Sequence, residues 1–259
     1  MIKQRLERLY LSRRILWDMT TRQLKANYAG SFLGIWWAVV TPLLLAVSIN
    51  FIFTVVFKVT MKDYYLFVLA GIIPWMFFIN ALNEAANSFS VNRSILKQGV
   101  FPRELVPLSC VLAYLLNFLI GFIFLLPLFA AADVRVAVFI PVLFLLALLE
   151  FIFIAGASLL LSCLNVFWPD LRCMLPVIFM VWFWITPVFY SLNMLTPSLR
   201  WICLLNPVTH YIVAYQRILF EIKPPAFSSF FLLSCLSFLS IALGGLFFIK
   251  KESQLLKRI

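Results

Sequence analysis

The chain has 259 residues, of which 64% are hydrophobic and only 12% are charged. A water-soluble globule of this length must show more polar surface, so the composition excludes a soluble protein and indicates one embedded in a membrane. The formal net charge of +11 does not require a nucleic-acid partner, because basic loops facing anionic lipid account for it.

The first element expected is an interfacial amphipathic helix within residues 1–30. On a helical wheel of residues 2–28, one face collects apolar side chains and most of the cations fall on the opposite face. This pattern is typical of a helix lying in the headgroup plane of a membrane, and a soluble helix packed on a partner is the alternative. Seven basic residues spread over residues 1–30 argue against a cleaved signal peptide.

Six apolar stretches are each long enough to cross a hydrocarbon core of about 30 Å as a helix. Five of these stretches, residues 26–57, 64–83, 105–132, 173–199 and 224–249, contain no Asp, Glu, Lys or Arg, and the sixth, residues 136–169, contains only Glu150. Their continuous apolar character favours helices over the alternating strands of a β-barrel. We therefore expect an all-α membrane protein, with residues 1–259 forming a single transmembrane domain and six spans at Phe32–Phe57, Leu66–Asn87, Leu105–Ala131, Val136–Leu164, Leu175–Tyr190 and Phe227–Ile249.

The basic residues are divided unevenly between the two sets of segments that flank these spans. Fifteen of the 21 lie in the amino-terminal segment, the 88–104 loop, the 165–174 loop and the carboxyl tail. Cytoplasmic loops carry an excess of Lys and Arg, so both termini are expected in the cytoplasm.

Two connecting regions are expected to have structure of their own. Residues 88–104 predict a short cytoplasmic helix ended by Gly99 and Pro102, either a docking element for a soluble partner or an ordinary solvated loop. Residues 191–223 contain an apolar stretch too short to span and broken by prolines. They predict two short re-entrant helices on the extracytoplasmic side, because backbone at that depth must be covered by protein or line a water-filled cavity.

Neither a catalytic site nor a metal site is expected in this chain. His210 is the single histidine, and no glycine belongs to a phosphate-binding GxxxxGK[ST] sequence. Glu150 lies deep in a span, where an acid is costly unless it is neutral or hydrogen-bonded. A structural role for Glu150 is favoured over a proton or ion relay, because Glu84 is the one other candidate partner within the spans.

Aromatic residues make up 17% of the chain and lie in clusters within the spans. Sugar rings stack on aromatic faces, so a pore lined by aromatic and uncharged polar groups would suit a carbohydrate chain. The polar groups could come from Asn50, Asn80, Asn83, Asn87 and Asn117. The alternatives are packing or lipid contact for the aromatics, and interhelical hydrogen bonds for the asparagines. The candidate channel residues are Trp36, Trp37, Trp75, Phe78, Asn80, Trp184 and Tyr190.

Several motifs together resemble those of one family. The most specific are RQLKANYAGSFLGIWWAVVTP, which begins at Arg22, and LNVFWPDLR, which contains Asp170. GIIPWMFFIN, WITPVFY and LLNPVTHY are weaker matches. On these residues, essentially the whole chain resembles the membrane subunit of ATP-binding-cassette exporters of cell-surface polysaccharide, the type-2 permeases that serve O-antigen, teichoic acid and capsule export.

The resemblance implies a permease of the bacterial inner membrane that binds no cofactor and has no ATPase site of its own, with Mg-ATP held by a partner. It implies two copies of this chain assembled with two ATP-binding-cassette subunits. A lipid-linked glycan, with O-antigen the favoured cargo of this lipopolysaccharide pathway, would pass between the two copies. The ATP-binding subunit would dock on the segment that contains Asn92, Ile95, Leu96 and Phe101.

A lipid-pyrophosphate head group would need cations at the cytoplasmic leaflet, where charge-assisted hydrogen bonds could hold it. The candidates are Arg22, Lys25, Arg93 and Lys97, and contact with anionic membrane lipid is their alternative role. Two other functions stay open. One is a membrane-embedded glycosyl- or acyltransferase that uses Asp170 or Asp63, and the other is an ion-coupled transporter that uses Glu150.

Overall fold

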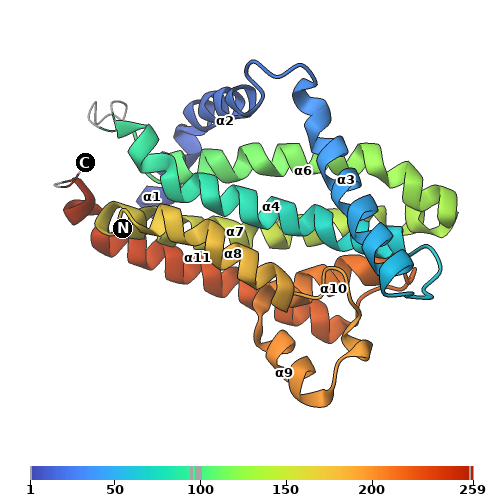
Figure 1. Ribbon diagram of the computed structural model, residues 1–259. Coiled ribbons are helices and arrows are strands. Elements are labelled where there is room, and N and C mark those ends of the chain that lie inside the picture. The colour runs from blue at the N-terminus through green and yellow to red at the C-terminus, as the bar shows by residue number, and fades with distance from the viewer. Residues whose placement is uncertain (1, 94–95, 97–100, 257, 259) are drawn as a thin grey trace.

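The computed structural model describes residues 2–93, 96, 101–256 and 258, which form helices joined by short loops (Figure 1). Within these residues, five helical segments are long and apolar enough to cross a membrane, and α8 is a shorter apolar helix of 15 residues. The all-α class expected from the sequence is confirmed. The long helices are α3 (Trp37–Phe51, preceded by η1 Gly34–Trp36 and followed by the π-helical turn η2 Ile52–Val56), α4 (Tyr64–Val91), α6 (Leu105–Ala132), α7 (Ile140–Phe167, preceded by η3 Val134–Phe139) and α11 (Phe227–Leu256).

The shorter helices lie at the amino terminus and before α11. The continuous helix expected over residues 2–28 is instead two helices, α1 (Ile2–Leu11) and α2 (Arg13–Asn27), interrupted at Ser12. The two short helices expected within residues 191–223 are present as α9 (Pro197–Leu205) and α10 (Pro207–Leu219), which follow the turn η4 (Leu192–Met194). Each begins with proline, whose missing N–H costs nothing at the first helical position.

Helix α8 (Leu171–Ile185) ends earlier than the predicted span Leu175–Tyr190. Thr186 has extended backbone angles, which a residue before proline favours because the ring of Pro187 clashes with a helical conformation. The side-chain amide of Gln216 then donates hydrogen bonds to the carbonyls of Pro187 and Val188, at 3.0 and 3.1 Å. The loop after α8 is thereby fastened to α10.

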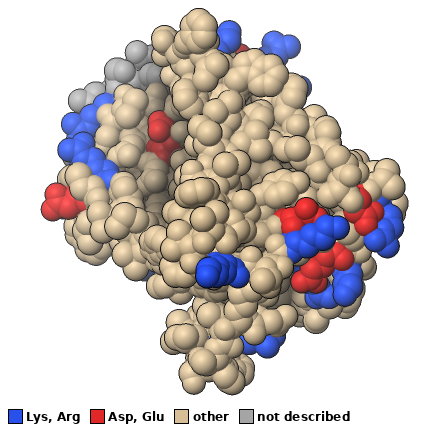
Figure 2. Space-filling model, turned by 45° about the vertical axis from the view of Figure 1, so that its right-hand side comes forward, with Lys and Arg blue, Asp and Glu red and all other residues tan. Residues whose placement is uncertain are grey.

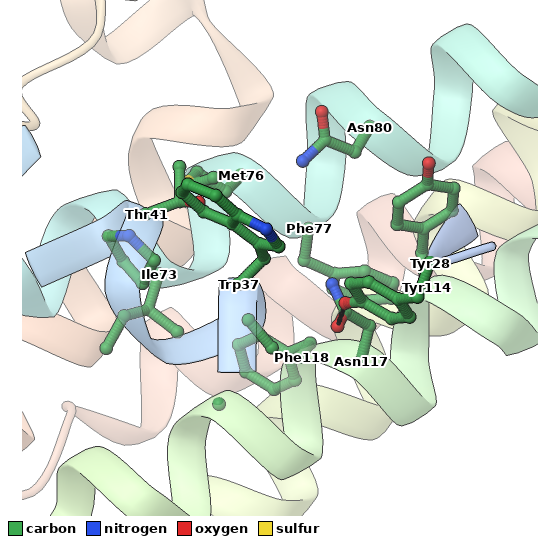
Figure 3. Close-up of a pocket in the computed structure, with 13 residues that line it drawn as sticks. Tyr28, Trp37, Thr41, Ile73, Met76, Phe77, Asn80, Tyr114, Asn117 and Phe118 are labelled. Carbon is green, nitrogen blue, oxygen red and sulfur yellow. Dashed lines mark hydrogen bonds between the residues drawn. The ribbon is translucent and has the colours of Figure 1, made fainter. Parts of the chain in front are cut away.

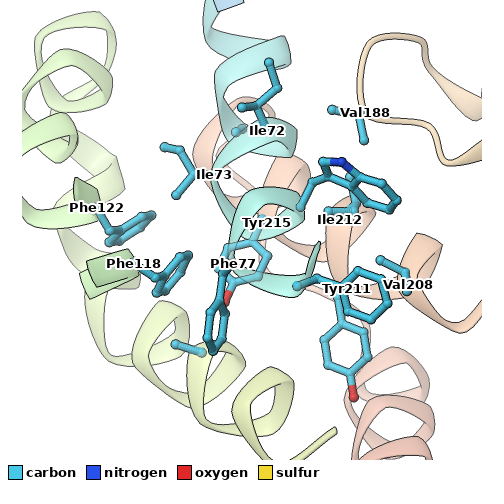
Figure 4. Close-up of a cluster of buried hydrophobic side chains, with 14 of the residues drawn as sticks. Ile72, Ile73, Phe77, Phe118, Phe122, Val188, Val208, Tyr211, Ile212 and Tyr215 are labelled. Atoms are coloured by element: carbon cyan, nitrogen blue, oxygen red, sulfur yellow. The ribbon is translucent and has the colours of Figure 1, made fainter. Parts of the chain in front are cut away.

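Helix α4 is the centre of the bundle. It packs against α3, α6, α7, α8 and α10, and most of its side chains are buried. Figure 4 shows Ile73 and Phe77 of α4 between Phe118 of α6 on one side and Ile212 of α10 on the other. The hydrophobic core therefore surrounds α4 and does not lie between two separate layers of helices.

Charged side chains lie mainly at the ends of the bundle. Figure 2 shows a face that is largely uncharged, on which Lys, Arg, Asp and Glu form separate small groups. A broad uncharged surface of this kind is what a hydrocarbon environment requires.

Helices α7 and α11 approach each other with almost no side chain between them. A Cβ built on Gly244 would lie 1.9 Å from the carbonyl oxygen of Gly156, so neither position has room for a larger residue. The hydroxyls of Ser237 and Ser240 in α11 donate to the carbonyls of Leu149 and Phe153 in α7, both at 2.7 Å. Small residues and interhelical hydrogen bonds of this kind hold helices together in lipid, where the hydrophobic effect adds nothing.

Both chain termini lie at one end of the bundle, which we call the terminal end (Figure 1). Four charged residues meet there. Arg5 of α1 pairs with Glu104 and Glu252, and Arg103 lies 3.5 Å from Glu252. Burial opposes the charge of Arg5, but the hydrogen bond to Glu252 and the charges of both acids outweigh it and raise the pKa of Arg5. These pairs join α1 to α11 and to the turn before α6.

An apolar cluster, which we call the terminal cluster, lies at the same end. It joins side chains of α4, α6, α7 and α11 with Leu96, which follows α4. The members are Phe89, Leu96, Val106, Leu159, Cys163, Phe248 and Leu255.

The contact between α7 and α11 predicts that Gly244→Val destabilises the protein. The added side chain must push the two backbones apart, and overpacking of this kind costs about 1–3 kcal/mol. The change should lower the Tm of the detergent-purified protein, measured by size-exclusion chromatography after heating. Gly245→Val is the matched control, because a Cβ on Gly245 meets nothing within 4 Å. Equal Tm values for the two variants would contradict the proposed contact.

The charged network predicts that Arg5→Glu lowers the Tm, since it removes two ion pairs, each worth about 0.2–1 kcal/mol when partly exposed, and adds a third acid. Adding Glu252→Arg should recover part of the loss. Arg8→Glu, on the exposed side of the same helix, is the control and should leave the Tm almost unchanged. The network is unimportant if Arg5→Glu and Arg8→Glu behave alike.

Candidate functional site

A cavity of about 280 Å³ lies between the end of α2 and helices α3, α4 and α6 (Figure 3). This volume is near the lower limit of small-molecule sites, which occupy about 300–1,000 Å³. The cavity, which we call the aromatic pocket, is lined by Tyr28, Trp37, Ala38, Thr41, Pro42, Ile73, Met76, Phe77, Asn80, Tyr114, Asn117, Phe118 and Gly121.

The turn between α2 and α3 places Trp37 in the pocket. Gly30 and Gly34 have φ angles of +75° and +53°, which other residues rarely adopt, so this turn depends on glycine. The hydroxyl of Ser31 accepts hydrogen bonds from the backbone N–H of Gly34, at 3.2 Å, and from the indole N–H of Trp37, at 3.0 Å. The indole ring is therefore held by the turn itself.

Helix α6 supplies the opposite wall. Tyr114, Asn117, Phe118 and Gly121 follow the spacing of one helical face, so all four point into the same space. Gly121 allows the close approach of α3, because a Cβ there would lie 2.5 Å from the carbonyl oxygen of Ala38. The hydroxyl of Tyr28 donates to the side-chain oxygen of Asn117 and joins the end of α2 to this wall.

The pocket combines aromatic faces with uncharged polar groups. Within the described residues, the side-chain amide of Asn80 makes no hydrogen bond, and the NH₂ of Asn117 is likewise left to donate. At membrane depth, polar groups without a protein partner require water or a polar ligand, because hydrocarbon cannot satisfy them. The arrangement suits a ligand with apolar faces and hydroxyl groups.

Of the seven candidate channel residues, Trp37 and Asn80 line this pocket. Trp75 and Phe78 also lie on α4, but their side chains are 3% and 2% exposed and pack against each other. Trp75 also contacts Phe183 of α8, so these two residues offer almost no surface to a substrate within a single copy of the chain.

The other three channel candidates lie outside the pocket. Trp36 is half exposed and its ring lies 5.1 Å from that of Phe124. Trp184 is 61% exposed at the end of α8. The hydroxyl of Tyr190 donates to the carbonyl of Ile185 at 2.8 Å, which holds the loop after α8.

Tyr28 and Tyr114 are not among the channel residues predicted from the sequence, and Asn117 is predicted only as one of five asparagines that could supply polar groups to the pore. Asn117 is a polar residue in an apolar span, and Tyr114 lies three residues before it on the same helical face. That spacing is the signal that could have identified the α6 wall.

The cations proposed for a head group lie in two places. Arg22 and Lys25 are exposed on α2. Arg93 lines a second hollow, of about 310 Å³, together with Arg172, where the loops after α4 and α7 meet. Lys97 lies outside the described residues.

The proposed docking residues are only partly described. Asn92 is half buried and its amide donates to the carbonyl of Ser88 at 2.9 Å. Leu96 is 3% exposed within the terminal cluster, and the half-buried Phe101 packs against the same cluster. Ile95 lies outside the described residues. In this structure Leu96 and Phe101 help to hold the segment against the bundle.

The acids named in the alternative functions are scattered. Both carboxylate oxygens of Glu150 and the hydroxyl of Tyr215 are buried close to each other, and neither side chain has a hydrogen-bond partner among the described residues. Asp63 precedes α4 in a left-handed conformation, and the exposed Asp170 precedes α8. Within the described residues, no three His, Cys, Asp or Glu side chains are grouped so that they could hold a metal ion.

Comparison with known proteins decides the family. Residues 15–220 match the family described as ABC-2 type transporter. The chain belongs to this family. It is 33% identical to the O-antigen export system permease protein RfbA of Klebsiella pneumoniae over 202 aligned residues. These residues cover 76% of this chain and 77% of that protein. A protein of the same name from Myxococcus xanthus is 30% identical over 219 residues, 84% of each chain.

Membership of the ABC-2 family confirms the resemblance expected from the motifs. The chain is a multi-pass membrane protein and the permease subunit of an ATP-binding-cassette transporter. The family implies a partner subunit that binds ATP. The matched range includes every residue of the aromatic pocket.

Proposed function

We propose that this permease is the transmembrane subunit of an ATP-driven exporter that moves a lipid-linked polysaccharide, with O-antigen the favoured cargo, across the bacterial inner membrane. The aromatic pocket is the observation that carries the glycan assignment. Its indole and phenol rings can stack on the C–H faces of a sugar, while Asn80, Asn117 and Thr41 can bond to the hydroxyl groups. Relatives in two bacteria bear the name of O-antigen export permeases, which supports the same cargo.

The proposed topology has six crossings with both termini in the cytoplasm. The excess of Lys and Arg at the terminal end supports this orientation. Helix α8 makes the fifth crossing together with the loop that follows it. The loop is needed because the 15 residues of α8, at about 1.5 Å each, are too short to cross the hydrocarbon core alone. Helices α1 and α2 lie at the cytoplasmic interface, and α9 and α10 re-enter from the opposite side.

Two copies of the chain work with two ATP-binding-cassette subunits in this proposal. The apolar side chains of α3 and α8 are largely exposed in a single copy, so these helices can face either lipid or a second copy. The ATP-binding subunits hold Mg-ATP and dock on residues 92–101, which follow α4 in the sequence. This chain contributes no catalytic group.

The proposed path begins at α2. Arg22 and Lys25 hold the pyrophosphate of the lipid carrier by charge-assisted hydrogen bonds, and the first sugar enters the aromatic pocket beside the end of this helix. The glycan then passes to a channel between the two copies. Aromatic contacts suit a moving chain because each one is weak, about 0.5–1.5 kcal/mol.

The exporter assignment predicts that a separate ATP-binding-cassette subunit purifies with this chain from its own host in mild detergent, in equal amount and with ATPase activity. Depletion of the chain should then cause one lipid-linked glycan to accumulate inside the cell, which identifies the cargo. If the chain purifies alone and no glycan accumulates on depletion, the exporter assignment is wrong.

The pocket predicts a specific loss of export for Trp37→Ala and Asn80→Leu. Loss of one stacking contact or one hydrogen bond, each worth about 1 kcal/mol, should reduce glycan export roughly fivefold without preventing assembly with the ATP-binding subunit. Surface glycan and co-purified subunit are measured in the same cells. Trp201→Ala is the matched control, because Trp201 is 70% exposed on α9 and outside the pocket. Normal export in both pocket variants would show that the glycan does not pass through the aromatic pocket.

A further inference from the structure

The walls of the aromatic pocket carry no charge. None of its thirteen lining residues is Lys, Arg, Asp or Glu. A sugar that carries a carboxylate would lose its water on entering and would meet no cation in return, which makes its burial strongly unfavourable. A neutral sugar meets no such penalty, because the amides of Asn80 and Asn117 can replace the water on its hydroxyl groups.

The nearest acid adds to this effect. Glu84 lies one helical turn after Asn80 on α4, so the two side chains project from the same face of the helix. It is also close to Tyr114, which lines the opposite wall. The negative charge of Glu84 therefore lies at the edge of the pocket.

The Glu84 carboxylate is held in place by a neutral partner. The amide of Gln23 on α2 donates to the Glu84 carboxylate at 2.8 Å, and the same amide donates to the side chain of Asn27 at 3.1 Å. Among the described residues, no Lys or Arg forms an ion pair with Glu84. Arg22 and Lys25 lie on either side of Gln23 in the sequence, but both side chains are exposed.

From this geometry we infer that the pocket selects an uncharged sugar and that Glu84 repels acidic sugars, such as uronic acids, from it. The inference rests on the proposed function, and it narrows the cargo to glycans whose sugar beside the pyrophosphate is neutral. The pyrophosphate itself stays outside, with Arg22 and Lys25, while the sugar enters.

The test uses the complete transporter, with its ATP-binding subunit, in proteoliposomes. Two probes are compared, polyprenyl-pyrophosphate-glucose and polyprenyl-pyrophosphate-glucuronate, which differ only in a carboxylate that replaces a CH₂OH group. The concentration of each probe that gives half-maximal stimulation of ATPase activity is measured. The glucose probe should act at a concentration at least about tenfold lower, because an unpaired carboxylate beside a like charge is disfavoured.

Two variants separate the contributions. Glu84→Gln keeps the hydrogen bond to Gln23 but removes the charge, so the preference for glucose should shrink to about threefold or less. Asn80→Lys places a cation inside the pocket and should shift the preference towards glucuronate. Glu221→Gln, at an exposed position just after α10, is the control and should leave the wild-type preference unchanged.

The outcomes distinguish this inference from the proposed function. If both probes stimulate the wild-type complex at equal concentrations, or if the preference is the same in the wild type, Glu84→Gln and Asn80→Lys, the selectivity is wrong and the exporter assignment stands. If neither probe stimulates the ATPase activity of the wild-type complex, the glycan-exporter assignment fails and the selectivity fails with it.

Discussion

Hydrocarbon offers no hydrogen-bond partner, and this constraint governs the structure wherever polar groups lie at membrane depth. Serine hydroxyls in the long helices turn back to carbonyls, either of their own helix, as Ser158 does to Ala155, or of a neighbour, as Ser237 does to Leu149. Two places depart from this pattern: the buried pair Glu150 and Tyr215, and the aromatic pocket, where Asn80 makes no hydrogen bond with the described residues. The pocket has room for a polar ligand, which can replace the missing partner.

The central position of α4 links that pocket to the rest of the protein. One side of the helix presents Asn80 and Phe77 to the pocket, another packs against α10, and its end at Val91 leads into the segment proposed to dock the ATP-binding subunit. The helix has 28 residues and is about 42 Å long, and its part from Phe77 to Val91 contains neither proline nor glycine. A push on the end of α4 at Val91 would thus reach Asn80 along one continuous helix, which is the simplest route for coupling in the proposed exporter.

Residue type predicts some of the side chains that line the aromatic pocket but not others. Trp37 and Asn80 were predicted because aromatic and amide groups in a span are the chemistry that a sugar needs. Trp75 has the same chemistry but is buried against Phe183, and nothing in its local sequence distinguishes it from Trp37. The difference arises from the turn at Gly30 and Gly34, which places Trp37 at the edge of the bundle. Trp75 instead lies on α4, the central helix, which is surrounded by α3, α6, α7, α8 and α10.

The sequence by itself determined that this is a helical membrane protein, where most of its long helices lie, and that two short helices precede the last one. These properties depend on hydropathy, helix length and the positions of proline, all of which are local. Only the tertiary structure decided which apolar faces meet, that Gly156 and Gly244 let α7 and α11 touch, and that α2, α3, α4 and α6 enclose a pocket. The physical reason is that lipid and protein interior are equally apolar, so hydropathy cannot distinguish a side chain that faces lipid from one that faces another helix.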